Sequence, residues 1–231
     1  MKNLVIIPAR GGSKRIPRKN IKDFLGKPII AYSIEAALQS GMYDEVMVST
    51  DDEEIAEIAK LYGASVPFYR SPATANDYAV TADVISEVLD CYEQLGKTFD
   101  NVTCLYSTAP FVSAKRLKES FDRLTGDIES VFTCVAYSFP IQRALHMVED
   151  KIEMIHPENM FARSQDLEPS YHDAGQFYTL TVDFFKKTKS LWGKNTAGIV
   201  LSELEVQDLD TLTDWTLAEM KYKLTRGNDK A

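Results

Sequence analysis

The run Leu4-Val-Ile-Ile7 is a short apolar segment rich in β-branched residues, and Pro8 ends it. The chain continues as the loop Ala9-Arg-Gly-Gly-Ser-Lys-Arg-Ile-Pro-Arg-Lys-Asn20. Residues 29–38 then have apolar side chains at helical spacing until Gly41. The order strand, loop, helix is the first unit of an α/β fold.

The same order of elements recurs along the chain. Apolar and β-branched runs predict further strands at residues 45–50, 102–106, 131–135, 176–182 and 198–201. Amphipathic runs predict further helices at residues 55–62, 80–95, 114–124 and 215–224. Strands that alternate with helices specify a mostly parallel sheet covered by helices on both faces. We therefore expect a Rossmann-like α/β fold.

The alternation breaks at about Pro140. Residues 144–155 alternate in polarity around a polar centre at 149–151, as a solvated β-hairpin does, and residues 157–174 show no clear period. We expect one domain over residues 1–231, with residues 140–175 as a protruding arm. Such an arm can cover a site or reach a partner subunit.

The composition is that of an ordinary folded protein. The 231 residues include 26 Lys and Arg against 34 Asp and Glu, a net charge of -8, which argues against a nucleic-acid partner. Cys91, Cys104 and Cys134 lie in apolar stretches without a CxxC motif, so we expect buried free thiols in a reducing compartment. No apolar run reaches about 18 residues, and the N-terminal apolar run is too short for a signal peptide. We expect a cytoplasmic protein with no membrane partner.

The loop between Arg10 and Asn20 concentrates positive charge. The first 27 residues contain eight Lys or Arg and a single acid, although the whole chain is negative. Open α/β sheets bind nucleotides beyond the carboxyl ends of their strands, which is where this loop lies. Gly11 and Gly12 allow positive φ angles and close backbone approach, so that successive N–H groups can form an anion nest. These features indicate a triphosphate site, with a solvated basic loop as the alternative.

Motifs of several other enzyme classes do not occur in the sequence. Neither GxxxxGK[ST] nor GxGxxG is present, which argues against a P-loop NTPase and against a dinucleotide oxidoreductase. No GxSxG motif and no thiol in a polar setting supplies a covalent nucleophile. This pattern suits a reaction that depends on positioning and charge neutralisation.

The segment Ile7-Pro-Ala-Arg-Gly-Gly-Ser-Lys14, followed by Ile16-Pro17 and Lys19-Asn20, resembles the signature of one enzyme family. This family is the cytidylyltransferases that activate eight- and nine-carbon keto-sugar acids, above all the CMP-sialic acid synthetase group. The resemblance covers nearly the whole chain in the family's order. Its further segments are Gly26-Lys-Pro28, Val48-Ser-Thr-Asp-Asp52, Thr108-Ala-Pro110, Arg163-Ser-Gln-Asp166 and Val206-Gln-Asp-Leu-Asp210.

Three features resemble the branch of this family that acts on pseudaminic acid. They are Arg15 after Lys14, Phe139-Pro-Ile-Gln-Arg143, and Tyr171-His-Asp-Ala-Gly-Gln-Phe-Tyr178. The resemblance implies a nucleotidyltransferase fold, and a reaction in which CTP and the sugar acid give CMP-sugar and pyrophosphate. It also implies a homodimer in which the arm reaches the neighbouring site.

The resemblance further implies a nucleotide site in the basic loop. Arg10 and Lys14 would contact the phosphates and Lys19 would stabilise the leaving pyrophosphate, which makes these three the expected catalytic residues. Ser13 and Asn20 would fix the nucleotide. The full expected nucleotide site is Arg10, Gly11, Gly12, Ser13, Lys14, Asn20 and Arg70. Arg70 is expected to contact cytosine, with a surface arginine at a strand end as the alternative.

Asp208 and Asp210 are the expected metal ligands. Mg²⁺, with Mn²⁺ as a substitute, would bridge the phosphates and take carboxylate oxygens. At spacing i, i+2 in an extended segment the two side chains share one face. The alternatives are that this pair caps the last helix, or that Asp51 and Asp52 are the ligands.

The sugar acid has a carboxylate and many hydroxyl groups, which call for cationic, amide and aromatic partners. The expected acceptor residues are Tyr106, Arg143, Arg163, Gln165, Tyr171, His172, Asp173, Gln176 and Phe177. Sialic-acid enzymes of the family usually have Gln before a Pro-Thr-Ser-Pro turn, where this chain has Tyr106-Ser-Thr-Ala-Pro110. We therefore expect pseudaminic acid as the acceptor.

Two groups of alternatives stay open from the sequence. The same reaction could use sialic, legionaminic or 3-deoxy-manno-octulosonic acid. A catalytically silent nucleotide-binding regulatory protein could also use the same scaffold.

Overall fold

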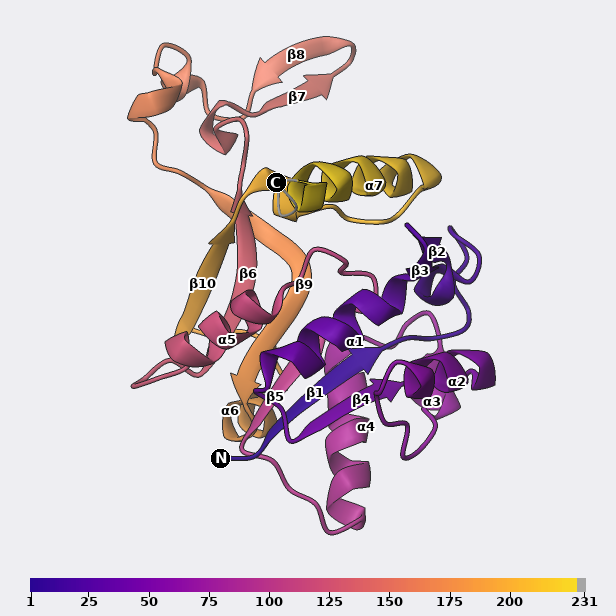
Figure 1. The fold of residues 1–231 in the computed structure, drawn as a ribbon. Helices are drawn as coiled ribbons and strands as arrows, with labels where there is room; N and C mark the ends of the chain where they lie inside the picture. The colour runs from indigo at the N-terminus through magenta and orange to yellow at the C-terminus, as the bar shows by residue number, and fades with distance from the viewer. Residues whose placement is uncertain (228–231) are drawn as a thin grey trace.

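The structure is a computed structural model that describes residues 1–227. Its centre is a six-stranded sheet in the order β10-β6-β9-β5-β1-β4 (Figure 1). The neighbouring strands are parallel, except that β9 is antiparallel to both β5 and β6. The strands are β1 Asn3–Pro8, β4 Glu45–Ser49, β5 Asn101–Leu105, β6 Ser130–Ala136, β9 Tyr171–Thr181 and β10 Thr196–Leu201. The expected mostly parallel α/β sheet is confirmed.

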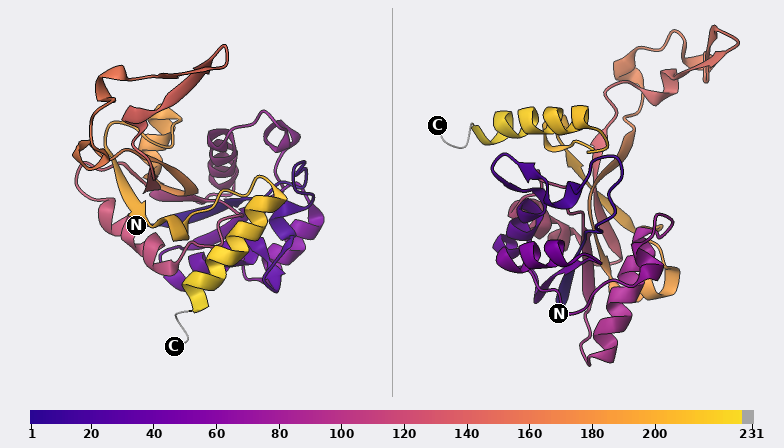
Figure 2. Two further views of the ribbon diagram at one scale, coloured as in Figure 1. Left: turned by 90° about the horizontal axis from the view of Figure 1, so that it is seen from above. Right: turned by 90° about the vertical axis from the view of Figure 1, so that its right-hand side faces the viewer.

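Helices cover both faces of this sheet (Figure 2). Side chains of α1, α2 and α5 share one core cluster, and side chains of α4 and α6 share the other. The helices are α1 Ile29–Ser40, α2 Glu53–Leu61, α3 Pro72–Ala75, α4 Thr81–Gln94, α5 Ala114–Arg123, α6 Val182–Thr188 and α7 Leu212–Gly227. None of the described helices is both long and apolar enough to cross a membrane.

The first strand contributes to both cores. Val5 and Ile7 of β1 lie in the cluster with α1, whereas Leu4 and Ile6 lie in the cluster with α4, and all four are fully buried. Successive side chains of a strand point to opposite faces, so a strand covered on both faces needs a continuous apolar run. Each of these side chains contributes about 1.5–3 kcal/mol by its burial.

The order of strands creates a crevice beside β1. The chain passes from β1 through α1 to β4 on one side, and later reaches β5 on the other side of β1 through α4. This reversal of direction is the switch point at which open α/β sheets bind ligands, beyond the carboxyl ends of the strands. The basic loop starts there, directly after Pro8.

A third core cluster holds the C-terminal part of the chain against the loop. Leu209 and Trp215 pack with Ile16, which belongs to the basic loop, and with Phe24. Phe24 lies in the short ribbon of β2 (Asp23–Phe24) and β3 (Lys27–Pro28) that follows the loop. This packing brings the segment around Leu209 next to the loop, 190 residues away in sequence.

The expected hairpin is present, and it lies far from the sheet. Strands β7 (Leu145–Val148) and β8 (Lys151–Met154) pair around a turn at Glu149 and Asp150, which have φ angles of 47° and 63°. The segment between β6 and β9 extends well beyond the body, as Figure 1 and the right-hand view of Figure 2 show.

Several elements differ from the sequence prediction, among them the four-residue helix α3, which was not expected. Strand β9 begins at Tyr171 rather than at residue 176, because Tyr171 and His172 pair with the end of β6. Residues 171–175 therefore belong to the sheet and not to the arm. The ribbon β2–β3 and helix α6 were not expected, since the ribbon strands have two residues each and α6 has seven.

Candidate active site

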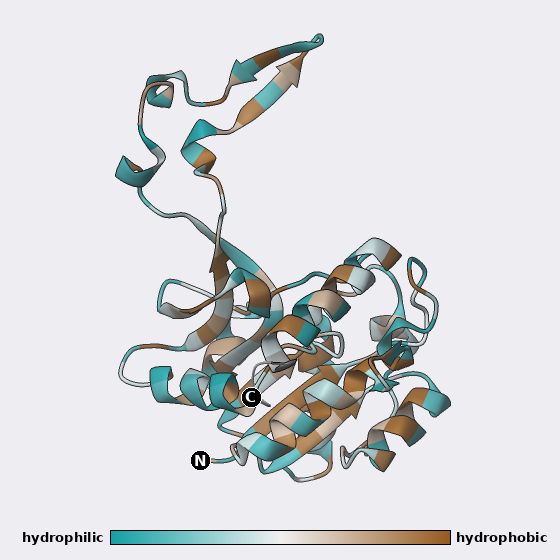
Figure 3. Ribbon diagram, turned by 45° about the horizontal axis from the view of Figure 1, so that its top comes forward, coloured by the Kyte–Doolittle hydropathy of each residue, from teal (hydrophilic) through white to brown (hydrophobic). Residues whose placement is uncertain are grey.

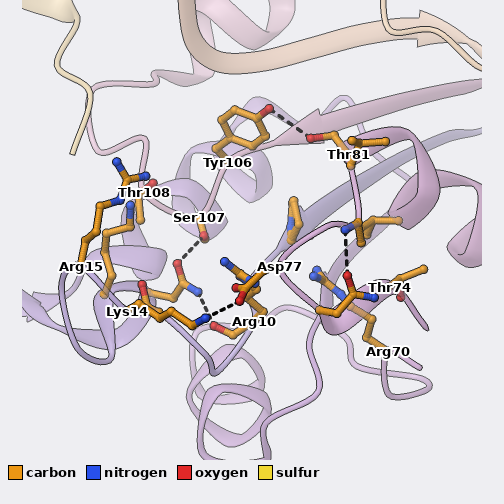
Figure 4. A pocket seen from close by; sticks show the side chains of 18 residues that line it. Arg10, Lys14, Arg15, Arg70, Thr74, Asp77, Thr81, Tyr106, Ser107 and Thr108 are labelled. Atoms are coloured by element: carbon orange, nitrogen blue, oxygen red, sulfur yellow. Dashed lines mark hydrogen bonds and ion pairs between the residues drawn. The ribbon is translucent and has the colours of Figure 1, made fainter. Parts of the chain in front are cut away.

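A cavity of about 490 Å³ opens at the carboxyl ends of β1 and β5 (Figure 4). Seven predicted site residues line it: Arg10, Ser13, Lys14, Lys19, Asn20, Arg70 and Tyr106. The opposite wall is the segment before and at the start of α4, which includes Asn76, Asp77 and Thr81. The structure thus brings the basic loop, Arg70 and Tyr106 together around one space.

Arg10 and Lys14 converge on a single carboxylate. Arg10 Nη1 donates to Asp77 Oδ1 at 2.6 Å, and Lys14 Nζ donates to Asp77 Oδ2 (Figure 4). These hydrogen bonds hold the pKa of Asp77 below its ordinary value, and the bond from Lys14 has the largest effect. The two cations therefore define one position for an anion, which the Asp77 carboxylate takes in this structure.

The two glycines of the loop act differently from the expectation. Neither Gly11 nor Gly12 has a positive φ angle. The Gly11 N–H donates to Asp51 Oδ1 at 2.9 Å and the Ser13 N–H donates to Gly11 O at 3.0 Å, so these two N–H groups do not form an open nest. Position 11 instead needs a glycine for steric reasons, because a Cβ atom there would lie only 2.7 Å from Asp52 Oδ2.

Asn20 joins the loop to the strand on the other side of the crevice. Its Nδ2 donates to Arg10 O at 2.8 Å, and its Oδ1 accepts from Ser107 Oγ at 2.9 Å. Ser107 follows β5, so this buried amide connects the carboxyl ends of β1 and β5. Asn20 therefore helps to shape the floor of the cavity.

Arg70 is buried at the cavity wall. Its Nε donates to Ser49 Oγ at 3.1 Å and its Nη2 donates to Ser49 O at 2.6 Å. Burial lowers the pKa of this guanidinium, with Asp51 as the largest opposing charge. The alternative of a solvated surface arginine is therefore wrong, and Arg70 presents a desolvated cation to the cavity.

Lys19 connects the loop to the predicted metal ligands. Its ammonium donates to Leu209 O at 2.7 Å. Burial lowers the pKa of Lys19, while the charges of Asp210 and Asp208 oppose that shift. Leu209 is buried in the core and its two neighbours are more exposed, so both aspartates lie on the opposite side of the segment, as their spacing predicted.

Helix capping does not account for Asp208 and Asp210. At the start of α7, Asp214 Oδ2 accepts from the Thr211 N–H at 2.7 Å and Thr211 Oγ1 accepts from the Asp214 N–H at 3.2 Å. This reciprocal pair is a capping box. Asp210 is bonded instead to the guanidinium of Arg15.

A second cavity of about 330 Å³ adjoins the first and shares Val80 and Thr81 with it. Its other lining residues are Ala82, Asp173, Tyr178, Lys189, Ser190, Leu191 and Trp192. Tyr178 donates its hydroxyl to Asp173 Oδ2, and Tyr106 Oη lies 3.2 Å from Thr81 Oγ1. The Tyr106 ring meets the Tyr178 ring edge-on, with centroids 5.9 Å apart. Two predicted acceptor residues thus line these cavities, Tyr106 the first and Asp173 the second.

The other predicted acceptor residues lie elsewhere. Phe177 is 0% exposed within the hydrophobic core, because β9 is covered on both faces; its observed role is packing, not sugar contact. Gln176 is also buried and donates to Glu205 O at 2.5 Å. Tyr171 and His172 are exposed at the start of β9, where the His172 ring packs against Tyr137.

Three predicted residues lie on the arm. Arg143 ends a short 3-10 helix (Ile141–Arg143), and Gln165 lies in another (Ser164–Asp166). The Arg163 guanidinium is 3.8 Å from the Asp166 carboxylate. The arm extends away from the two cavities of its own chain, so the structure does not bring these three residues to them (Figure 1).

Sequence reasoning missed Asp77, Thr81 and Trp192. Asp77 contacts residues 63 and 67 positions away, which no local pattern reveals. Thr81 lies at the start of a predicted helix, and that position was the available signal. Trp192 follows α6, a helix that was itself not predicted.

Comparisons with known proteins point to a nucleotide-using enzyme, as the cationic cavity does. Residues 4–196 match the family model of the cytidylyltransferases. The chain is 43% identical over 226 residues to pseudaminic acid cytidylyltransferase of Campylobacter jejuni subsp. jejuni serotype O:2, with 97% of each chain covered. It is 36% identical to CMP-N,N'-diacetyllegionaminic acid synthase of Legionella pneumophila subsp. pneumophila, with 98% of each covered. Its fold is similar to that of a CMP:2-keto-3-deoxy-manno-octonic acid synthetase solved with CTP, with a TM-score of 0.70, 19% identity, and 98% and 100% of the two chains covered.

Proposed function

Because the chain belongs to the cytidylyltransferase family, we propose that it transfers CMP from CTP to the anomeric hydroxyl of pseudaminic acid and releases pyrophosphate. The observation that carries the proposal is the convergence of Arg10 and Lys14 on one anion position, beside Lys19 and beyond the carboxyl end of β1. The 43% identity to an enzyme named for pseudaminic acid supports the choice of acceptor.

The reaction requires positioning and charge neutralisation more than covalent chemistry. A sugar hydroxyl attacks the α-phosphorus of CTP, and pyrophosphate leaves in line. Arg10 and Lys14 stabilise the phosphate charge, and Lys19 stabilises the leaving pyrophosphate. Since Lys19 is partly buried and held by Leu209 O, its charge acts in a partly water-free site, where electrostatic stabilisation is stronger.

The nucleoside end of CTP fits the wall formed by Arg70. This guanidinium is desolvated and held by Ser49, so it is a fixed donor toward the cavity. The cytosine ring has a carbonyl oxygen and a ring nitrogen that accept hydrogen bonds, and a rigid donor favours such a base.

A magnesium ion fits the donor set at Asp208 and Asp210. The two carboxylates both act on the charge of Lys19, so they lie near the loop that is proposed to bind the phosphates. Among the described residues no group of three His, Cys, Asp or Glu side chains could hold a metal, so a metal here would take its remaining ligands from phosphate and water. Mg²⁺ is commonly bound by one or two carboxylates together with phosphate oxygens and water. Bound there, it would neutralise charge on the phosphates, and Mn²⁺ would substitute because it accepts the same oxygen ligands.

The second cavity is the proposed acceptor pocket. It adjoins the nucleotide cavity at Thr81 and offers the Asp173 carboxylate, the Tyr178 hydroxyl and the Trp192 ring. Sugar acids present hydroxyl and acetamido groups that match carboxylate and hydroxyl partners, while an aromatic face suits the apolar side of the ring.

The arm supports a proposed homodimer. Phe139 and Phe161 are 84% and 93% exposed, and the hairpin adds further exposed apolar residues. Brown segments of the ribbon in Figure 3 mark the apolar residues of the hairpin. A two-stranded hairpin alone is marginally stable in water, so this surface calls for a cover. A second copy of the chain would cover this surface. The arm of the first copy would then place Arg143, Arg163 and Gln165 near the cavities of the second. Sedimentation should show a dimer that Phe161→Ser weakens.

We place the reaction in the cytoplasm. All three cysteines are free thiols, which suits a reducing compartment; Cys104 and Cys134 are buried as expected, whereas Cys91 is only partly buried.

The function is tested by incubating the purified protein with CTP, Mg²⁺ and pseudaminic acid and following phosphorus by NMR. We expect equal amounts of CMP-sugar and pyrophosphate, and a strongly reduced rate for Arg10→Ala. Binding of CTP without either product would favour the regulatory alternative.

A further inference from the structure

Arg18 belongs to the basic loop, but it is not among the residues that line the cavity. Its Nη2 donates to Asp52 Oδ1 at 3.0 Å, its Nη1 donates to Asp52 Oδ2, and Nη2 also bonds Glu54. Its backbone is left-handed, with φ 55° and ψ 30°, a conformation that non-glycine residues rarely adopt. Such a conformation persists where the surrounding contacts impose it.

The other end of the loop is tied to the same place. The Gly11 N–H donates to Asp51 Oδ1 at 2.9 Å, and Gly11 packs so closely on Asp52 that a Cβ atom would not fit. Asp51 and Asp52 lie between β4 and α2, so both ends of the loop are tied to one rigid junction. The residues between the two ties include Ser13 and Lys14, which line the cavity.

Asp52 itself is held firmly. Its Oδ1 accepts from the Ile55 N–H at 3.0 Å, which caps α2, and its own N–H donates to Thr50 Oγ1 at 3.1 Å. The bond from Arg18 holds the pKa of Asp52 below its ordinary value, and the same bond raises the pKa of Arg18. The pair thus stays charged across the pH range in which the protein would work.

From these contacts we infer that Asp52 acts through Arg18 as a positioning residue, which fixes the phosphate-binding loop before the nucleotide arrives. This inference rests on the proposed function. It also separates Asp52 from the metal: both of its carboxylate oxygens are bonded to Arg18, so binding a metal ion would require this pair to break.

The test compares Asp52→Asn, Arg18→Gln and the double variant with Glu53→Gln. Asn caps helices as well as Asp does, so Asp52→Asn keeps α2 while removing the charge that holds Arg18. Glu53 is exposed in the first turn of the same helix, so its variant is matched in charge and place. Binding of CTP and of inorganic tripolyphosphate is measured by calorimetry, and KM is measured for CTP, the sugar acid and Mg²⁺.

We expect Asp52→Asn and Arg18→Gln each to weaken tripolyphosphate and CTP binding by about tenfold or more, because a misplaced loop loses preorganised contacts. The double variant should be no worse than either single one, and KM for the sugar acid and for Mg²⁺ should not change. Additive defects, a raised Mg²⁺ requirement, or binding by Asp52→Asn equal to that of Glu53→Gln would overturn the inference. Failure of the wild type to bind CTP would instead contradict the proposed function.

Discussion

Lys19 donates a hydrogen bond of 2.7 Å to the main-chain oxygen of Leu209, 190 residues further along the chain. This bond joins the basic loop to the segment that carries Asp208 and Asp210. It also places a partly buried cation beside two carboxylates, whose charges oppose the effect of burial on its pKa. The groups proposed to bind pyrophosphate and metal are therefore built as one unit.

Lys19 should set the alkaline limit of activity. The pKa of Lys19 lies below its ordinary value of 10.5, and burial is the largest cause of this shift. The ammonium therefore loses its proton at a lower pH than a free lysine does. We expect kcat/KM for CTP to fall as pH rises through this lowered pKa. Lys19→Arg stays charged there and should move the decline to higher pH. Lys19→Ala should lower kcat/KM by about 10²–10³-fold at pH values below this pKa, and its deficit relative to the wild type should shrink above it. Profiles of the same shape for wild type and Lys19→Arg would contradict this role.

The metal requirement should depend on Asp208 and Asp210. Chelation should abolish activity and Mg²⁺ or Mn²⁺ should restore it, because the two carboxylates fit a hard cation. Asp208→Asn and Asp210→Asn should each raise the Mg²⁺ concentration for half-maximal rate by about tenfold or more. Asp90→Asn, on the exposed face of α4, is the control. A metal requirement unchanged in both variants would move the site elsewhere.

Asp77 should compete with the triphosphate for Arg10 and Lys14. Asp77→Asn removes a carboxylate that both cations now bind, so CTP should bind more tightly. Since exposed ion pairs are weak and screened by salt, the expected gain is about two- to tenfold at low salt, and it should shrink at high salt. Asp90→Asn controls for net charge. Weaker CTP binding by Asp77→Asn would mean that Asp77 contacts the nucleotide or its metal instead.

Asp173 should affect the sugar acid and not CTP. Its carboxylate accepts from Tyr178 and, at 2.8 Å, from the Gly175 N–H, and it lines the second cavity. Asp173→Asn should raise KM for the sugar by about tenfold, because a charged hydrogen-bond partner is lost. Steady-state kinetics with each substrate varied in turn decides this, with Asp183→Asn as the control. A defect confined to CTP would show that the second cavity does not hold the acceptor.

The sequence predicted those parts of the molecule that depend on neighbouring residues. The apolar run of β1 and the basic loop after it are adjacent, so the position of the loop followed from strand order alone. The i, i+2 spacing of Asp208 and Asp210 in an extended segment likewise predicted that the two side chains share one side, and the burial of Leu209 between them agrees with this.

The rest depends on contacts between distant residues. Asp77 meets the loop only because the segment before α4 crosses the crevice. Phe177 was predicted as a sugar contact because it is an aromatic residue beside imidazole, carboxylate and amide groups in sequence, but β9 is covered on both faces and buries it. The start of β9 at Tyr171 depends on pairing with β6. Its first residues, Tyr171 and His172, are both exposed, so the sequence there lacks the alternation of apolar and polar residues that indicates a strand.

Acceptor choice is the most direct test of the proposed function. With saturating CTP and Mg²⁺, kcat/KM is measured by pyrophosphate release for pseudaminic, sialic, legionaminic and 3-deoxy-manno-octulosonic acids. Polar groups built for one sugar are left unpaired by an epimer, so we expect pseudaminic acid to be preferred by about 100-fold or more. Equal values for pseudaminic acid and any of the other three would contradict the assignment.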